Sequence, residues 1–171
     1  MQIRLAEESD AEALYALAKR TFIETYEKDN SPENMAVYLA ETFAPEKQLQ
    51  EIRDPNRIIA LGWSGDQPIG FFHLLKCPPH PSVKGPKPIE LLRLYLDLGW
   101  QGRGAGAALL QEAMKTASGQ GYQTMWLTVW ERNFKAQKFY EKYGFATVGT
   151  SEFAVSTDIQ TDLVMARVLG P

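Results

Sequence analysis

The sequence predicts an α/β fold of the α+β type: one domain, residues 1–171, with a mixed central sheet of about seven strands flanked by about four helices. The length of 171 residues is that of a single domain with a sizeable core. Strand-like and helix-like apolar patterns alternate along the chain in an order that suits a mixed sheet. The sequence contains no internal repeat and no low-complexity tract.

The first third of the chain is expected to be mainly helical. Residues 3–5 form a short strand, and Ser9 or Asp10 is expected to cap the helix that follows. Apolar residues recur in this helix at a spacing of three to four: Leu14, Leu17, Ala18 and Phe22. Ser31 and Pro32 open a second helix, with proline at its first position. A further short helical piece is predicted at "PEKQLQEI".

The rest of the chain alternates between strands and helices. "RIIALGW" and "PIGFFHLLK" are predicted strands, and the intervening "SGDQ" predicts a hairpin. The proline-rich segment "CPPHPSVKGPKP" is expected to be a surface loop. After it come the strand "IELLRLYLD", the helix "GRGAGAALLQEAMKTAS", the strand "QTMWLTVW" and the helix "NFKAQKFYEKYG". The tail holds two more strand candidates, "ATVGTSEF" and "TDLVMARVL".

Composition restricts the classes of function. The net charge of −3 argues against nucleic acid as a partner. A single cysteine, Cys77, excludes a disulfide framework, and its surroundings indicate a structural or incidental thiol. With His73 and His80 it does not make a metal site, so no metal is expected. The N-terminus lacks an apolar signal core and no long apolar run occurs, so we expect a cytoplasmic protein without a membrane partner.

The stretch "QGRGAGA", Gln101 to Ala107, is typical of a phosphate-binding loop. A P-loop would end in G-K-[ST], but those positions are apolar here. Read from Gly102 the stretch fits the dinucleotide fingerprint, and Glu131 lies near the place of a ribose-binding acid. However, "DLGWQ" separates the strand from the first glycine, and about forty residues after Glu131 are too few for a second half-sheet. The third interpretation is the pyrophosphate loop of an acyl-CoA enzyme.

A second motif, "ERNFKAQKFYEKYGF", favours the third interpretation. Together with Gln101, Gly104 and Gly106, it resembles the GNAT N-acetyltransferase superfamily, whose C-terminal signature is N-x-x-A-x-x-x-Y-x-x-x-G-F. The matching residues are Asn133, Ala136, Tyr140, Gly144 and Phe145. Asn133 and Tyr140 are two helical turns apart and share one side of a helix that Gly144 would end. The two motifs look most like PaiA-type spermidine/spermine acetyltransferases.

This resemblance implies the GNAT fold, with a sheet splayed in the middle, and acetyl-CoA as cosubstrate. It also implies that an amine attacks the thioester directly, that Tyr140 protonates the departing thiolate as general acid, and that no metal takes part. The backbone of Leu94, Tyr95 and Leu96 is expected to bind the pantetheine arm and to polarise the thioester carbonyl. The other cofactor-binding residues that it implies are Gln101, Gly102, Arg103, Gly104, Ala105, Gly106, Ala107, Asn133, Ala136 and Tyr140.

The residues that would bind and activate the acceptor amine are less defined. Glu90 opens the strand before the loop, where histone acetyltransferases of the superfamily place a general base, and alternation puts it on the face of Leu92 and Leu94. Glu24, Tyr26 and Glu27 are candidates for substrate binding, and His73 is a weaker one. The resemblance suggests a polyamine acceptor and is compatible with a homodimer. A protein N-terminus or another small amine stays open as acceptor, as do a non-catalytic CoA-binding sensor and an interaction domain.

Overall fold

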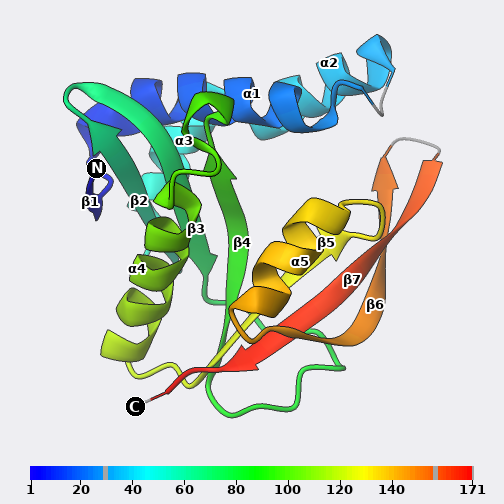
Figure 1. Ribbon diagram of the computed structural model, residues 1–171. Coiled ribbons are helices and arrows are strands. Elements are labelled where there is room, and N and C mark those ends of the chain that lie inside the picture. The colour runs from blue at the N-terminus through cyan, green and yellow to red at the C-terminus, as the bar shows by residue number, and fades with distance from the viewer. Residues whose placement is uncertain (29–30, 156–157, 171) are drawn as a thin grey trace. The chain divides into compact units, whose positions relative to one another are not determined.

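The computed structural model describes residues 1–28, 31–155 and 158–170 (Figure 1). In these residues it has seven strands and five helices, with 3₁₀ turns at Glu8–Asp10 and Leu98–Trp100. The helices are α1 (Ala11–Tyr26), α2 (Pro32–Thr42), α3 (Pro45–Arg53), α4 (Ala105–Gly119) and α5 (Phe134–Lys142). The strands are β1 (Gln2–Leu5), β2 (Arg57–Ser64), β3 (Gln67–Leu75), β4 (Pro88–Leu96), β5 (Thr124–Trp130), β6 (Ala146–Val155) and β7 (Asp158–Val168).

The predicted fold class is confirmed, and every predicted strand is present. The helix count is five rather than about four, because the short piece predicted at "PEKQLQEI" forms the nine-residue helix α3. Pro45 stands at the start of α3, where its missing N–H costs nothing.

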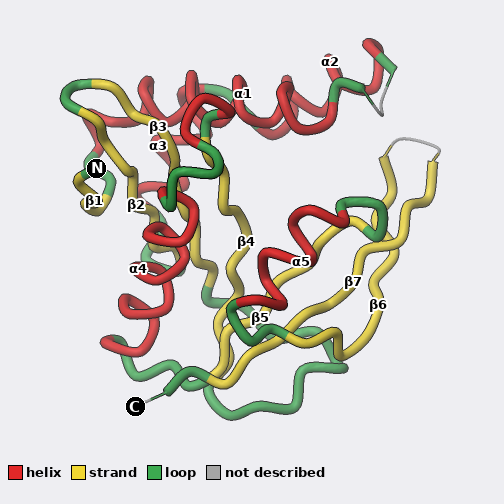
Figure 2. Tube along the Cα trace, viewed as in Figure 1, coloured by secondary structure: helices red, strands yellow, loops and turns green. Residues whose placement is uncertain are grey.

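The strands are hydrogen-bonded in the order β1-β2-β3-β4-β5-β7-β6 (Figure 2). The pairs β1–β2, β5–β7 and β6–β7 are antiparallel, whereas β4–β5 is parallel, so the sheet is mixed. Within the described residues, the register of β4 with β5 covers Pro88 to Glu90 alone. The splay that the resemblance implies stays a prediction.

The chain divides into two compact units. The first unit comprises Met1–Leu74 and Arg93–Ala113, and the second comprises Leu75–Leu92 and Met114–Pro171. Strand β4 and helix α4 each contribute residues to both units. That the chain functions as one domain stays a prediction.

In the first unit, helices cover both faces of the strands. One face packs Leu61 and Phe71 against the apolar side of α1, whose Leu14, Leu17, Ala18 and Phe22 are buried as predicted. On the other face, Leu109 of α4 lies against Gly62 and Gly70, where a Cβ atom would come within 3.3 Å and 2.7 Å of its side chain. Glycine at these two positions lets α4 approach the strands closely.

In the second unit, β5 and β7 carry different side chains on their two faces. Trp126 and Val164 lie on one face, where Val83 of the segment before β4 packs against them. That proline-rich segment is thus a loop, as predicted, but Val83 anchors it. The other face is covered by α5, and Arg167 of β7 donates a hydrogen bond there to the carbonyl of Tyr143 (Figure 1).

The prediction that the side chain of Ser9 or Asp10 caps helix α1 is wrong. Asp10 is the residue before α1, but its side chain makes no capping hydrogen bond to that helix. Instead, its carboxylate accepts bonds from Arg4 at 2.6 and 2.8 Å and from the Glu7 amide at 2.8 Å. These partners lower the pKa of Asp10 and join β1 to the start of α1.

Candidate active site

The glycine loop leads directly into helix α4 of the first unit. Gly102 and Gly104 have φ angles of +75° and +83°, which side-chain-bearing residues rarely adopt. Gly104 precedes the helix, and its carbonyl accepts the first helical bond, from Ala108 at 3.0 Å. A Cβ atom at Gly102 or Gly104 would meet no atom within 4 Å, so nothing in the fold itself fills that space.

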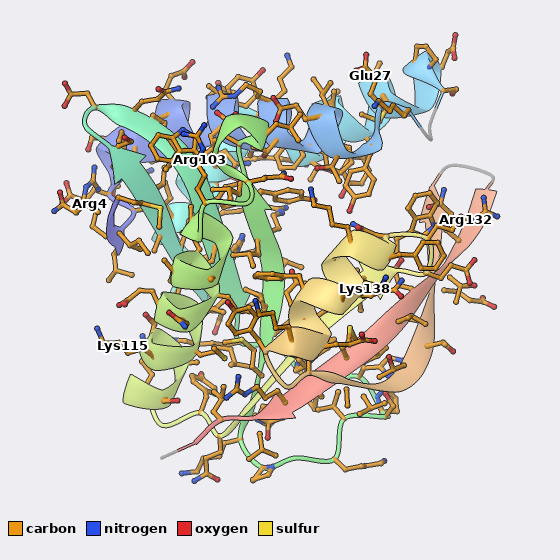
Figure 3. The ribbon with its side chains drawn as sticks, viewed as in Figure 1. Arg4, Glu27, Arg103, Lys115, Arg132 and Lys138 are labelled. Atoms are coloured by element: carbon orange, nitrogen blue, oxygen red, sulfur yellow. The ribbon has the colours of Figure 1, made fainter. Side chains whose placement is uncertain are left out.

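This loop fits an anion such as the pyrophosphate of CoA. The amides of Ala105, Gly106 and Ala107 lie in the first turn of α4, where a helix supplies no acceptor, and they have no acceptor among the described residues. The positive end of the helix dipole lies at the same place. Arg103 is exposed and lies over the Trp100 ring, 5.9 Å from its centroid, without an ion-pair partner in the described chain (Figure 3).

Helix α1 fixes the beginning of the loop. Arg20 forms an ion pair with Asp97 at 2.9 Å, and Glu24 accepts a bond from the Leu98 amide at 3.4 Å. Gln101 donates its side-chain amide to the Leu96 carbonyl at 3.4 Å. Glu24, predicted on the acceptor side, therefore contacts the segment that leads into the glycine loop.

The end of β4, Leu94 to Leu96, belongs to the first unit. Its side chains alternate: Leu96 lies near Gly70 on the α4 side, whereas the Tyr95 ring packs with Phe22 and Phe71 under α1. Burial raises the pKa of Tyr95 well above its usual value. The Tyr95 side chain is thus part of the core, which leaves its backbone for the predicted contact with pantetheine.

The other two acceptor-side candidates have different surroundings. Tyr26 packs its ring 4.6 Å from that of Phe22 and hydrogen-bonds Tyr95. Glu27 is exposed just after α1 (Figure 3). Of the two, Glu27 has the accessible charge that a cationic substrate would need.

The second motif forms helix α5 and its two ends in the second unit. Asn133 caps the helix, because its Oδ1 accepts the Ala136 amide at 3.1 Å. Gly144, with φ +78°, ends it as predicted. The Phe145 amide bonds the Tyr140 carbonyl at 3.1 Å and the Gly144 amide bonds the Glu141 carbonyl at 2.9 Å, a Schellman arrangement.

Tyr140 has its ring held by neighbours in its own segment. The ring centroids of Phe139 and Phe145 lie 5.3 Å and 5.6 Å from it, both edge-on. The residue is 9% exposed. A phenol with a buried ring and a small exposed fraction is suited to a single, fixed direction of proton donation.

Glu90 is buried on the opposite face of the second unit's sheet. It pairs in register with Trp126, whose side chain packs on the Val83 and Val164 face, away from α5. Its exposed fraction is 9%, and the Cys77 thiol donates to its Oε2 at 3.2 Å. The predicted acid and base thus lie on the two faces of one sheet.

Asp162 is a candidate that the sequence did not single out. In β7 it pairs with Trp130, on the same face as Trp126 and Glu90. Its carboxyl hydrogen-bonds Thr128, but burial raises its pKa. The sequence did contain a signal: "TDLVMARVL" places a charged side chain on a strand face whose alternate residues are apolar.

His73 does not belong to this group. It is fully buried in the first unit between Arg57 and Arg93, with Nε2 and Nδ1 at 3.2 and 3.4 Å from their guanidinium groups. Burial, and then these two charges, lower its pKa to about 2. It stays neutral and inaccessible, so its weaker candidacy as an acceptor residue was wrong.

The described residues contain neither a metal-binding cluster nor a membrane-spanning helix. No group of three or more histidine, cysteine, aspartate or glutamate residues there could hold a metal ion. None of the helices described is long and apolar enough to cross a membrane.

The fold and the two motifs define an acyl-CoA-dependent transferase, and comparison with known proteins agrees. The profile of the acetyltransferase (GNAT) family matches residues 11–145, so the chain belongs to that family. An uncharacterized N-acetyltransferase of Lactobacillus delbrueckii is 30% identical over 162 residues, 95% of this chain and 94% of the relative. The protein is an acetyl-CoA-dependent N-acetyltransferase.

One sequence match and one structural match come from Thermoplasma acidophilum. A spermidine N(1)-acetyltransferase is 31% identical over 153 residues, 88% of this chain and 91% of that protein. The crystal structure of PaiA N-acetyltransferase in complex with coenzyme A superposes with a TM-score of 0.79 at 26% identity, covering 98% of this chain and 99% of the other.

Proposed function

We propose that the protein acetylates a primary amine by direct attack on acetyl-CoA, and that the preferred acceptor is a polyamine such as spermidine or spermine. The glycine loop carries the proposal, because the Ala105, Gly106 and Ala107 amides have no acceptor among the described residues and suit the pyrophosphate of an acyl-CoA donor. The similarity to a spermidine acetyltransferase supports the choice of acceptor.

The glycine loop would hold the pyrophosphate. Acetyl-CoA, when bound, supplies an activated acyl group on a thiol leaving group. The amides of Ala105, Gly106 and Ala107 would donate to phosphate oxygens, and Arg103 would add an ion pair. Gln101 and Gly102 shape the loop, while the backbone of Leu94, Tyr95 and Leu96 would bind the pantetheine arm and Asn133 and Ala136 would border it.

Two different residues, one on each face of the second unit's sheet, would carry out the two proton transfers. Glu90, buried and hydrogen-bonded by the Cys77 thiol, would take the proton that the amine loses, directly or through a water molecule. Tyr140, its ring held by Phe139 and Phe145, would give a proton to the thiolate of CoA. Neither step needs a metal ion.

Carboxylates support a cationic acceptor. Glu90 and Asp162 pair with Trp126 and Trp130, four residues apart on β5, so they lie about 13 Å apart along the strand direction. That separation is of the order of a polyamine's length, so Asp162 would hold the distal ammonium while Glu90 serves the reacting amine. In the first unit, Glu24 and Glu27 would add attraction.

The choice of acceptor is tested by measuring the release of CoA from acetyl-CoA with each of a panel of amines. We expect kcat/KM for spermidine and spermine to exceed that of simple monoamines, and the ratio to fall as salt screens the charges. The alternatives are a peptide N-terminus or another small amine, each of which would then outrank polyamines in the same panel. A non-catalytic CoA sensor would bind CoA and release none with any amine.

The proposal also includes the cellular location and the oligomeric state of the protein. Polyamines are small cytosolic cations, and we propose a cytoplasmic location and a homodimer. Fractionation and light scattering would test each of these.

A further inference from the structure

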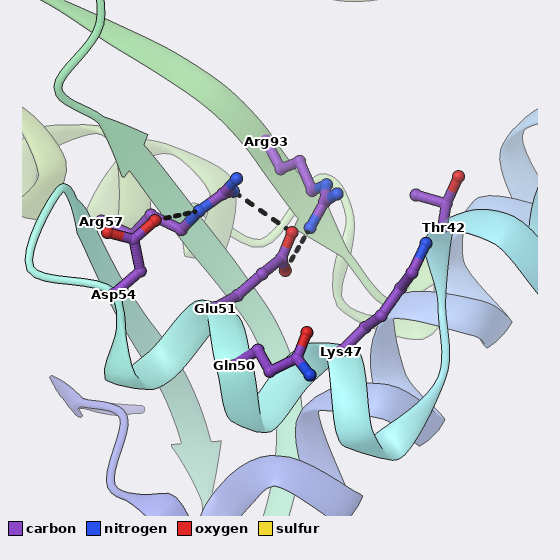
Figure 4. Close-up of a pocket in the computed structure, with 7 residues that line it drawn as sticks. All are labelled: Thr42, Lys47, Gln50, Glu51, Asp54, Arg57 and Arg93. Atoms are coloured by element: carbon purple, nitrogen blue, oxygen red, sulfur yellow. Dashed lines mark hydrogen bonds and ion pairs between the residues drawn. The ribbon is translucent and has the colours of Figure 1, made fainter.

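A cavity of about 420 Å³ opens in the first unit, apart from every residue assigned above (Figure 4). Helices α2 and α3 line it together with strands β2 and β4. The lining residues are Thr42, Lys47, Gln50, Glu51, Asp54, Arg57 and Arg93.

The carboxylates of this cavity are already paired. Glu51 Oε1 accepts from Arg57 at 3.2 Å, and Glu51 Oε2 accepts from Arg93 at 2.8 Å. Asp54 Oδ1 accepts the Asn56 amide at 2.9 Å, and Asp54 Oδ2 accepts the Arg57 Nε–H at 3.1 Å. Each of the four oxygens therefore has a donor, and a cationic ligand would have to compete with an arginine.

Donors, in contrast, remain available. The Lys47 ammonium and the Nη2 groups of Arg57 and Arg93 have no partner among the described residues. In Figure 4 the Lys47 side chain extends toward Thr42, and the Arg93 guanidinium lies beside Glu51. Thr42 and Gln50 add a hydroxyl and an amide, also without a partner in the part of the chain that is described.

The charges of the cavity do not balance. Lys47, Arg57 and Arg93 are three cations against two carboxylates, Glu51 and Asp54. The side chains of Arg57 and Arg93 are only 24% and 14% exposed, so water screens their charge incompletely. One bound anion would balance the excess.

The two arginines are held in place beforehand. His73, buried beneath them, lies within 3.4 Å of both guanidinium groups and is neutral, because its pKa is about 2. The Arg93 guanidinium also lies 5.2 Å from the centroid of the Phe43 ring. Held guanidinium groups lose little freedom when they bind a planar or tetrahedral oxyanion.

We propose that this cavity is a binding site for the oxyanion of a small molecule, a carboxylate or a phosphate, contacted by Lys47 and by the outward Nη2 groups of Arg57 and Arg93. Gln50 and Thr42 would supply further donors. The site is independent of the proposed acetyl transfer, since all its groups lie outside the residues assigned to that reaction.

Residue-resolved NMR titration tests this. Succinate and inorganic phosphate are added separately, at constant ionic strength against chloride, with saturating CoA present to fill the glycine loop. We expect saturable shifts in the amides of residues 42–54 with at least one anion. Succinate alone would identify a carboxylate site, phosphate alone a phosphate site, and both a general oxyanion site. No saturable shift with either would overturn the proposal.

Two substitutions that introduce opposite charges at the exposed residue Gln50 make the test specific. Gln50→Glu should weaken binding of the probe at least about tenfold, the effect of one charged hydrogen bond, and Gln50→Lys should strengthen it. Lys47→Gln should also weaken it about tenfold. Lys28→Gln, an equal charge change at an exposed residue after α1, should leave the affinity unaltered. Equal affinities in the Gln50→Glu and Gln50→Lys variants would refute the assignment.

Discussion

The thiol of Cys77 lies 3.2 Å from Oε2 of Glu90 and donates a hydrogen bond to it. The cysteine was expected to be merely structural, yet it touches the carboxylate that is proposed to collect the substrate's proton. If the thiol positions that carboxylate, Cys77→Ala should lower kcat about tenfold, the scale of one hydrogen bond to a charged group. Cys77→Ser, which keeps a donor, should retain most of the activity, and KM for acetyl-CoA should change in neither.

Glu90→Gln tests the base itself. The amide keeps the shape and the contact with Cys77 but cannot accept a proton, so the rising acidic limb of the pH profile of kcat/KM should flatten. A profile of unchanged shape with only a raised KM would make Glu90 a binding residue. The matched control is Glu131→Gln, at an exposed position after β5.

Tyr140→Phe should leave the fold and the affinity for acetyl-CoA unaltered, because the ring contacts with Phe139 and Phe145 remain. We expect kcat to fall by roughly 10²-fold, the scale of a positioned acid. The defect should shrink with an acyl donor whose leaving thiol is more acidic. Tyr143→Phe, which removes a phenol hydroxyl at the end of the same helix, is the control. Full activity in Tyr140→Phe would mean that another group supplies the proton.

Gly104→Ala tests the loop. Acetyl-CoA at a hundredfold its Kd should stabilise the native protein by about 2.7 kcal/mol. The substitution costs about 1–2 kcal/mol at a positive φ and places a methyl group in the space expected for phosphate, so the rise in Tm with ligand should disappear. Gly65→Ala, in the β2–β3 turn at φ +59° and also with nothing within 4 Å, carries similar strain and should keep the rise. If both variants kept it, the phosphate would lie elsewhere.

His73 should make stability depend on pH. Its pKa is about 2 in the folded protein against 6.5 as the ordinary value, so the unfolded chain binds the proton first as pH falls. The free energy of unfolding should therefore decline, by about 1.4 kcal/mol per pH unit below about pH 6.5 from this residue alone. Urea titrations at pH 7 and pH 5 should show a smaller decline in His73→Gln than in wild type. His80→Gln, an equal substitution in the proline-rich loop, is the matched control.

Much of the fold could be predicted because the chain's periodicities agree with their tertiary context. The alternation in "RIIALGW" and the three-to-four spacing in α1 describe buried faces, and the structure buries them. The cap at Asp10 failed because a competing partner, Arg4 on β1, lies six residues away in sequence and satisfies the carboxylate better. Propensity alone carries no information about such a partner.

The same distinction applies to the candidate site, where some residues could be predicted from the sequence and others could not. Gly102, Gly104, Asn133 and Gly144 could be placed from sequence because local backbone geometry demands those residue types. Asp162 and the cavity around Glu51 could not, because the pKa of Asp162 is raised by burial and the cavity needs Arg93, which lies 42 residues from Glu51. The contact of Cys77 with Glu90 depends likewise on the path of the proline-rich loop.

The bonds that Arg20 and Glu24 make to Asp97 and Leu98 have a practical consequence. They span 77 and 74 residues, so the glycine loop is held by a helix that is synthesised long before it. The heptapeptide "QGRGAGA" is consequently not a portable module. Grafted onto another strand–helix junction it would keep its glycines but lose the clamp at its entrance. A designer who wished to transplant CoA binding would have to move α1 with it.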